Sequence, residues 1–132
     1  MPEGDYGFKP SPMPDVRTYG QLFAHVAEGQ FGTCATAKGV PNPNHRKSLE
    51  HELKTKAEFV KVLADSFAFC DDLFSALTDA GAMEFVKLGK GEVVRGAVLA
   101  GLLAHSSEMY GIRPSIYAPR TSCRHPPATE RR

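Results

Sequence analysis

The stretch "TKAEFVKVLADSFAFCDDLFSAL", residues 55–77, carries the clearest helical signal of the chain. It opens with a Thr-x-x-Glu pattern, in which the Thr55 hydroxyl can accept the backbone N–H of Glu58 while the Glu58 carboxylate reaches back to Thr55. Apolar side chains then recur at intervals of three and four residues: Phe59, Val62, Leu63, Phe67, Cys70, Phe74 and Leu77. This spacing predicts a helix over about residues 56–79, with Gly81 as a candidate C-cap.

Two other stretches also show helical spacing. The first begins at a candidate N-cap, Asp15, and continues to Gly39, with an apolar side made of Tyr19, Leu22, Phe23, Val26 and Ala27. The second covers about residues 92–110 and has one row made of Val94, Val98, Leu102 and His105. Residues 39–47 are rich in proline and asparagine and are predicted as a loop. Residues 82–91 are predicted as a loop or short turn, and no stretch predicts a strand.

These patterns predict one all-α domain. The chain has 132 residues, 42% of them hydrophobic and 23% charged, as in soluble globular proteins. We expect an up-and-down helical bundle with three long helices over residues 15–111. Residues 1–14, with four prolines, are expected to be irregular, and so is a basic tail at residues 112–132. Three helices with broad apolar faces either close on themselves or leave surface for another helix or another chain.

Charge and cysteine usage bound the partners and the compartment. Residues 113–132 hold five arginines and one acidic residue, but no basic helix or aromatic-basic motif accompanies them, so nucleic-acid binding is not favoured. No apolar run is long enough to span a membrane, and residues 1–14 do not resemble a signal peptide. Cys34 and Cys70 lie in helical patterns and are interpreted as small buried hydrophobes, because an odd count of three argues against a disulfide framework. The expected location is the cytoplasm.

Two histidines occupy apolar helix faces. His25 shares a face with small residues on the first helix, and His105 does so on the last, as a metal site between helices would require. Glu108 could supply a third ligand, since it follows His105 by three residues on the same side of a helix. The alternative is that each is an ordinary histidine of the core, which spacing alone favours. His45, His51 and His125 lie in polar segments and are not candidates.

The sequence also resembles a known family. The segments "MPEGDYGFKPSPMPDVRTYGQLFAHVAEGQF", "TKAEFVKVLADSFAFCDD" and "LLAHSSEMYG", over residues 1–111, are similar to the DinB-like superfamily of metal-binding helical bundles. The resemblance implies a four-helix bundle that holds a divalent metal, zinc or nickel, through three histidines. Two of these positions are His25 and His105, and the third falls on Met109. Either Glu108 substitutes, or the site binds metal weakly, or it has lost its metal. Some relatives are thiol-dependent transferases or isomerases, which implies a low-molecular-weight thiol as cofactor and a transferase or hydrolase activity.

The chain departs from this family at both ends. The opening family helix is missing, so we expect a truncated chain, exported if a signal peptide has been lost upstream. After Gly111 the sequence "PSIYAPRTSCRHP" replaces the family's ending. One set of codons for it reads "VYLRAKDIVPPS" in another frame, which resembles that ending and predicts a frame shift. The competing expectation is a non-catalytic or degenerate module that forms a homodimer through the uncovered apolar face.

Overall fold

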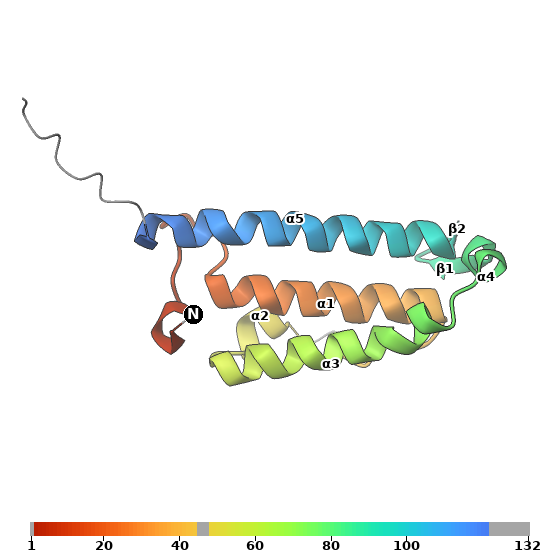
Figure 1. Cartoon of the computed structure of the whole chain (residues 1–132), viewed down its shortest axis with the longest axis horizontal. Helices are drawn as coiled ribbons and strands as arrows, with labels where there is room; N and C mark the ends of the chain where they lie inside the picture. The colour runs from red at the N-terminus through yellow and green to blue at the C-terminus, as the bar shows by residue number, and fades with distance from the viewer. Residues whose placement is uncertain (1, 45–47, 122–132) are drawn as a thin grey trace, which may run out of the picture.

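Three long helices lie side by side in the computed structural model, which describes residues 2–44 and 48–121, with side chains to residue 112. Helix α1 (Tyr19–Lys38) lies between α3 (Lys56–Ser75) and α5 (Arg95–Thr121) (Figure 1). The short elements are η1 (Glu3–Asp5), α2 (Leu49–Glu52), α4 (Asp79–Met83), β1 (Phe85–Leu88) and β2 (Gly91–Val94). The chain is therefore mostly helical, in line with the expected all-α class.

Helix α3 begins as the sequence predicts and ends earlier. The Thr55 hydroxyl accepts the backbone N–H of Glu58 at 3.3 Å, and the Glu58 carboxylate accepts the backbone N–H of Thr55 at 2.8 Å, which confirms the capping box. The C-cap is Ala76, and the prediction of Gly81 is wrong. A new helix, α4, has already started there, with the Thr78 hydroxyl accepting the Gly81 N–H at 3.1 Å.

Helix α1 has a different start from the predicted one. Its N-cap is Thr18 and not Asp15, because Thr18 forms a capping box with Gln21 that satisfies a free N–H of the first turn. Its end is as predicted: Gly39 adopts a left-handed conformation with φ of 69°. A residue with a Cβ atom would be strained in that conformation.

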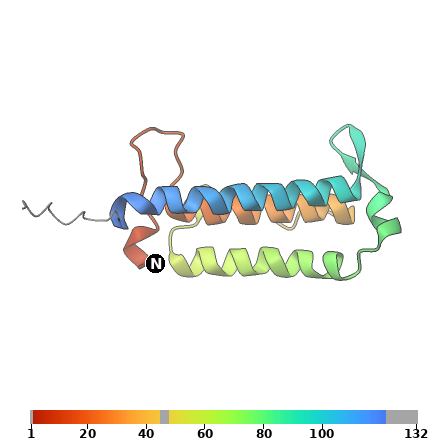
Figure 2. The ribbon, with the colours of Figure 1, turned by 45° about the horizontal axis from the view of Figure 1, so that its top comes forward.

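The prediction of no strands is wrong for residues 85–94. β1 and β2 pair antiparallel, with Val86 opposite Val93 and Leu88 opposite Gly91. The two residues between the strands include Gly89 with φ of 62°, which a tight hairpin turn requires. Figure 2 shows the hairpin and the N-terminal segment at opposite ends of the long helices. The valines and the glycine of this stretch are a hairpin signal that helical spacing does not reveal.

Helix α5 is longer than expected. The prediction of irregular structure from residue 112 is wrong up to Thr121, because the backbone stays helical through Pro114 and Pro119. Proline removes a hydrogen-bond donor and strains the preceding turn, but its fixed φ is itself compatible with a helix. The rest of the predicted tail, residues 122–132, lies outside the described residues. Among the helices that are described, none has the length and apolar character needed to cross a bilayer.

The core lies around α1 and includes part of the N-terminal segment. Tyr6 is buried, and its ring stacks on that of Phe59 with centroids 5.7 Å apart. Gly20 allows this contact, since a Cβ atom there would lie 2.5 Å from the Phe59 ring. The Gly20 N–H also donates to the Tyr6 carbonyl at 2.8 Å. Residues 1–14 lack regular structure beyond η1 in their described part, but they pack against the helices.

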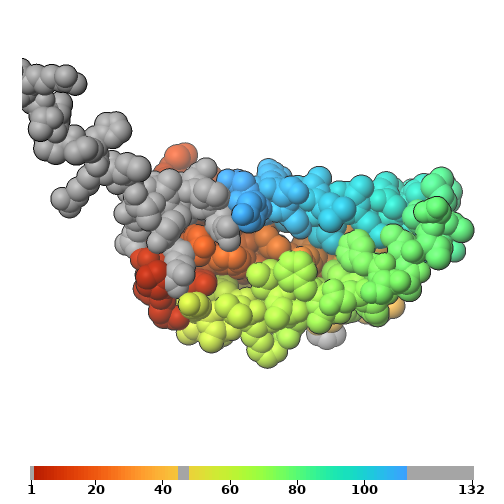
Figure 3. Space-filling model, viewed as in Figure 1, coloured from red at the N-terminus to blue at the C-terminus, as the bar shows by residue number. Residues whose placement is uncertain are grey.

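One apolar face stays open. A groove of about 320 Å³ runs between α3 and α5 with α1 as its floor, and Figure 3 shows this hollow. Its apolar lining consists of Leu22, Phe23, Val26, Leu63, Phe67, Met109 and Tyr110. Phe67 and Tyr110 are 51% and 66% exposed. The predicted α3 stripe is thus only partly buried, and the three helices do not close on themselves.

A disulfide joins α1 to α3. Cys34 and Cys70 are buried, as expected, but their sulfur atoms are bonded across 36 residues of chain. The interpretation as small free hydrophobes is therefore wrong. The third cysteine, Cys123, lies outside the described residues. An odd count excludes only a fully paired set, and it does not prevent two of the cysteines from pairing.

Removal of this disulfide is expected to lower the free energy of unfolding by about 3–4 kcal/mol, since the bond closes a long loop in the unfolded chain. The variant Cys34→Ala/Cys70→Ala tests this by urea denaturation. Cys123→Ala is the matched control, because it leaves the bonded pair in place. Equal midpoints for the double variant and the control would contradict the bond.

Candidate functional site

Two histidines face each other between α1 and α5. The Nε2 atoms of His25 and His105 are 3.1 Å apart, and their ring centroids are 5.0 Å apart. Gly29 makes room for this arrangement one turn after His25. A Cβ atom there would lie 3.2 Å from His105 Cε1, closer than an unstrained contact. The glycine that weakens α1 as an isolated helix therefore lets the two imidazoles meet.

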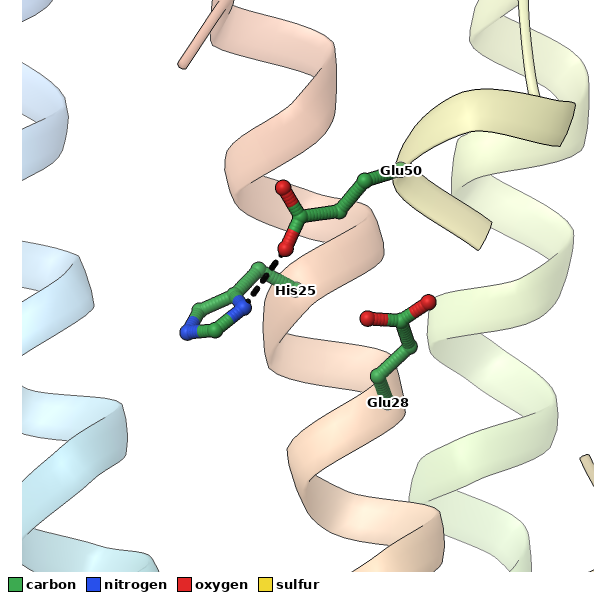
Figure 4. A group of neighbouring side chains, drawn as sticks. All are labelled: His25, Glu28 and Glu50. Carbon is green, nitrogen blue, oxygen red and sulfur yellow. Dashed lines mark hydrogen bonds and ion pairs between the residues drawn. The ribbon is translucent and has the colours of Figure 1, made fainter. Parts of the chain in front are cut away.

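A carboxylate from α2 holds the other side of His25. Glu50 Oε1 lies 2.7 Å from His25 Nδ1, a contact that Figure 4 marks with a dashed line. Glu50 Oε2 accepts the Nε–H of Arg17 at 2.8 Å. An ionised carboxylate can only accept hydrogen bonds, so Nδ1 of His25 carries the proton. In the neutral imidazole, Nε2 then bears a lone pair, and His105 Nε2–H is the donor between the rings.

The surroundings of the pair favour a neutral His105 and an ionised Glu50 carboxylate. Burial alone would raise the pKa of Glu50, but hydrogen bonds from Arg17 and His25 outweigh it and hold that pKa below its ordinary value. Burial, and then the positive charge that His25 can carry, lower the pKa of His105; the nearby Glu108 carboxylate opposes this. Neutral imidazole is the form that binds divalent metals.

The predicted ligands come together only in part. His25 and His105 meet, whereas Glu108 is exposed, and no hydrogen bond or ion pair within the described residues joins it to either ring. Met109 is 9% exposed and belongs to the apolar cluster that includes Leu22. Its thioether packs in the core at the position where the resemblance places a third histidine. His51 is exposed on α2, as expected. His45 and His125 lie outside the described residues.

A second set of groups lies on the Nδ1 side. Ligand atoms of His25, Glu28 and Glu50 lie within 4.8 Å of one another, and each of these residues is partly buried. Some of their acceptor positions are already engaged: Glu50 pairs with Arg17 and His25, while Glu28 accepts the backbone N–H of Leu49. A cation bound there by His25 would displace the Nδ1 proton that Glu50 accepts and compete with Arg17 for Glu50, whereas a cation at Nε2 needs only one proton to leave Nε2 of His105.

Sequence reasoning missed Glu28 and Glu50. Glu28 follows His25 by three residues, so their shared helix face was a usable signal. Glu50 gave none, since it lies beyond a loop of about ten residues whose path no periodicity predicts. No family model, no curated protein and no solved structure matches this chain. The chemistry of the site must therefore be argued from its own geometry.

The lowered pKa of His105 predicts a stability that falls on acidification. Because its folded-state pKa lies below 6.5, the unfolded chain takes up a proton first as the pH drops. The stabilisation is complete above 6.5 and is lost as the pH falls through the folded-state pKa. Urea unfolding of metal-free protein at about pH 7.5 and about pH 5.5 measures this.

The variant His105→Gln is the control, since it removes this proton uptake and keeps a polar side chain. We expect the parent chain to lose more unfolding free energy between the two pH values than His105→Gln does. Equal losses would contradict the assignment to His105.

Proposed function

We propose that this chain is a DinB-like bundle that binds one divalent metal ion, zinc or nickel, through Nε2 of His25 and Nε2 of His105. The 3.1 Å separation of these atoms carries the proposal. Two imidazole nitrogens at 2.0–2.1 Å from a tetrahedral zinc lie about 3.4 Å apart, so small ring movements suffice. A hydrogen bond between neutral histidines explains the metal-free geometry equally well, and metal binding decides between the two.

The proposed activity is that of a transferase or hydrolase that uses a small thiol or water. Bound metal would supply a Lewis acid that lowers the pKa of a thiol or water. Two protein ligands leave coordination positions for that group and for Glu108, which we propose as auxiliary ligand or base. The exposure of Glu108 supports the second role, because a base must reach groups that arrive from solvent.

The disulfide supports a proposal about the compartment. Disulfides persist in oxidising compartments and are rare in the cytoplasm. The bond between Cys34 and Cys70 thus supports the exported alternative over the cytoplasmic location expected from sequence. We propose that the chain acts outside the cytoplasm.

Metal binding is tested with zinc alone. We expect about one zinc per chain by mass spectrometry, and about 2.7 kcal/mol of stabilisation at free zinc about 100-fold above the dissociation constant. His25→Ala and His105→Ala each remove one of two ligands and should abolish the stoichiometric binding. His51→Ala is the matched control, since His51 is exposed and lies next to Glu50 on α2.

Metal-free parent protein after incubation with zinc, or unchanged binding by His25→Ala, would exclude the proposed site. Loss of binding in His51→Ala as well would point to adventitious surface chelation. Glu108→Gln should keep the metal and lose activity if Glu108 acts as a base.

A non-catalytic module that forms a homodimer is the second candidate, and the open groove between α3 and α5 favours it. Phe67 and Tyr110 at its rim are exposed, and aromatic anchors of this kind dominate interface energies. An apolar surface that stays in water is unfavourable at about 25 cal/mol per Å². A second copy that docks its own groove residues would bury it in a symmetric dimer.

For the dimer, light scattering across a dilution series should show a concentration-dependent rise in mass. Phe67→Asp places a charge in the groove and should weaken dimerisation about tenfold or more. Phe85→Asp is the control, because Phe85 is 68% exposed on the hairpin and does not line the groove. A monomer at every concentration, with cooperative unfolding, would argue against this candidate.

A further inference from the structure

The position of helix α2 depends on contacts with other parts of the chain. It has four residues, one turn, and a single turn is not stable in isolation. Side chains of α1 fix it: the Glu28 carboxylate accepts the Leu49 N–H at its start, and Gln21 Nε2 donates to the Glu50 carbonyl at 3.3 Å. With His25, these residues are spaced by three and four along α1 and share one face. The α1 face therefore determines where the Glu50 side chain lies.

Both oxygens of the Glu50 carboxylate accept hydrogen bonds. One accepts from His25 Nδ1 at 2.7 Å and the other from Arg17 Nε at 2.8 Å. The side chain of Glu50 is only 16% exposed, so water competes weakly for these bonds. A carboxylate held at two points by charge-assisted bonds has little freedom to rotate. It therefore fixes both the proton position and the ring plane of His25.

We propose that Glu50 is a positioning residue of the metal site: its carboxylate keeps His25 in the Nδ1–H form, with the Nε2 lone pair directed at His105. This inference rests on the proposed function. Metal-bound histidines generally donate their other N–H to a carboxylate or carbonyl, which orients the ring and raises its basicity. The resemblance to the DinB-like family says nothing about Glu50; the role follows from the contacts of α2.

Glu50 acts through His25 and not as a ligand. A cation bound by both residues would sit at Nδ1, where it would displace the proton that Glu50 accepts. It would also compete with Arg17 for the carboxylate. His105 lies on the Nε2 side of the ring and could not reach that cation. Only an ion at the Nε2 position can be bound by both histidines. Glu50 then contacts Nδ1, the other ring nitrogen of the ligand His25.

The test compares Glu50→Gln with Glu52→Gln in the full chain. Both replace a glutamate of α2 by an amide of the same shape, but Glu52 is exposed. Zinc chloride titrations against a competing chelator should show affinity about 10–100-fold weaker for Glu50→Gln and unchanged for Glu52→Gln. Nitrogen-15 NMR of the metal-free imidazoles should show His25 as Nδ1–H in the parent and as mixed tautomers in Glu50→Gln.

The readouts separate the two ideas. If the parent binds no zinc, the proposed function fails, and unchanged tautomers in Glu50→Gln then overturn the positioning role as well. If the parent binds zinc and Glu50→Gln binds it equally well, the metal site stands and the inference is overturned. Should Glu50→Gln unfold too readily, Glu50→Asp keeps the charge on a shorter side chain. Weaker zinc binding by Glu50→Asp supports the inference, and unchanged binding overturns it.

Discussion

The burial of α1 on several sides is the constraint on which the rest of the structure depends. Small residues permit it: Ala24 and Ala27 are fully buried, and Gly20 and Gly29 admit the Phe59 ring and the His105 ring. Such a helix has poor intrinsic propensity at its glycines, so packing must stabilise it. The disulfide to α3 and the docked N-terminal segment add to that packing. Because α1 is fixed, its faces can position groups from distant parts of the chain.

Two faces of α1 position different groups. At about 100° per residue, the face of Gln21, His25 and Glu28 is centred about 130° around α1 from that of Leu22, Val26 and Gln30. The first set holds α2 and the Glu50 carboxylate, and the second forms the floor of the open groove. The proposed metal site and the proposed dimer surface therefore use different faces of α1. Each can be weakened by substitutions that leave the other unchanged.

Sequence patterns predicted the structural features that depend on local chemistry. The Thr55–Glu58 capping box, the end of α1 at Gly39 and the meeting of His25 with His105 were predicted from spacing or from the family resemblance, and they are present. What failed depends on tertiary contacts. The Cys34–Cys70 pairing requires the register of α1 against α3, and Glu50 requires the path of the chain before α2. No periodic pattern in the sequence indicates the register of α1 against α3 or the path of the chain before α2. The missed hairpin at residues 85–94 is a different case, because its own turn and strand residues indicated it.

The arrangement of α5 indicates from which side the metal shell would be completed. Glu108 and Met109 lie on opposite sides of His105 around the helix, by about 60° and about 40°. Met109 faces the groove with Ser106 and Tyr110, and its thioether is a poor ligand for zinc or nickel. Carboxylates lie near both rings: Glu108 acts electrostatically on His105, and Glu28 and Glu50 lie near His25. The negative charge of these carboxylates favours a bound cation. Within the described residues, Arg17 offsets part of that charge through its ion pair with Glu50. If the proposed metal site forms, a third protein ligand is therefore expected from Glu108 rather than from the groove side, where Met109 lies.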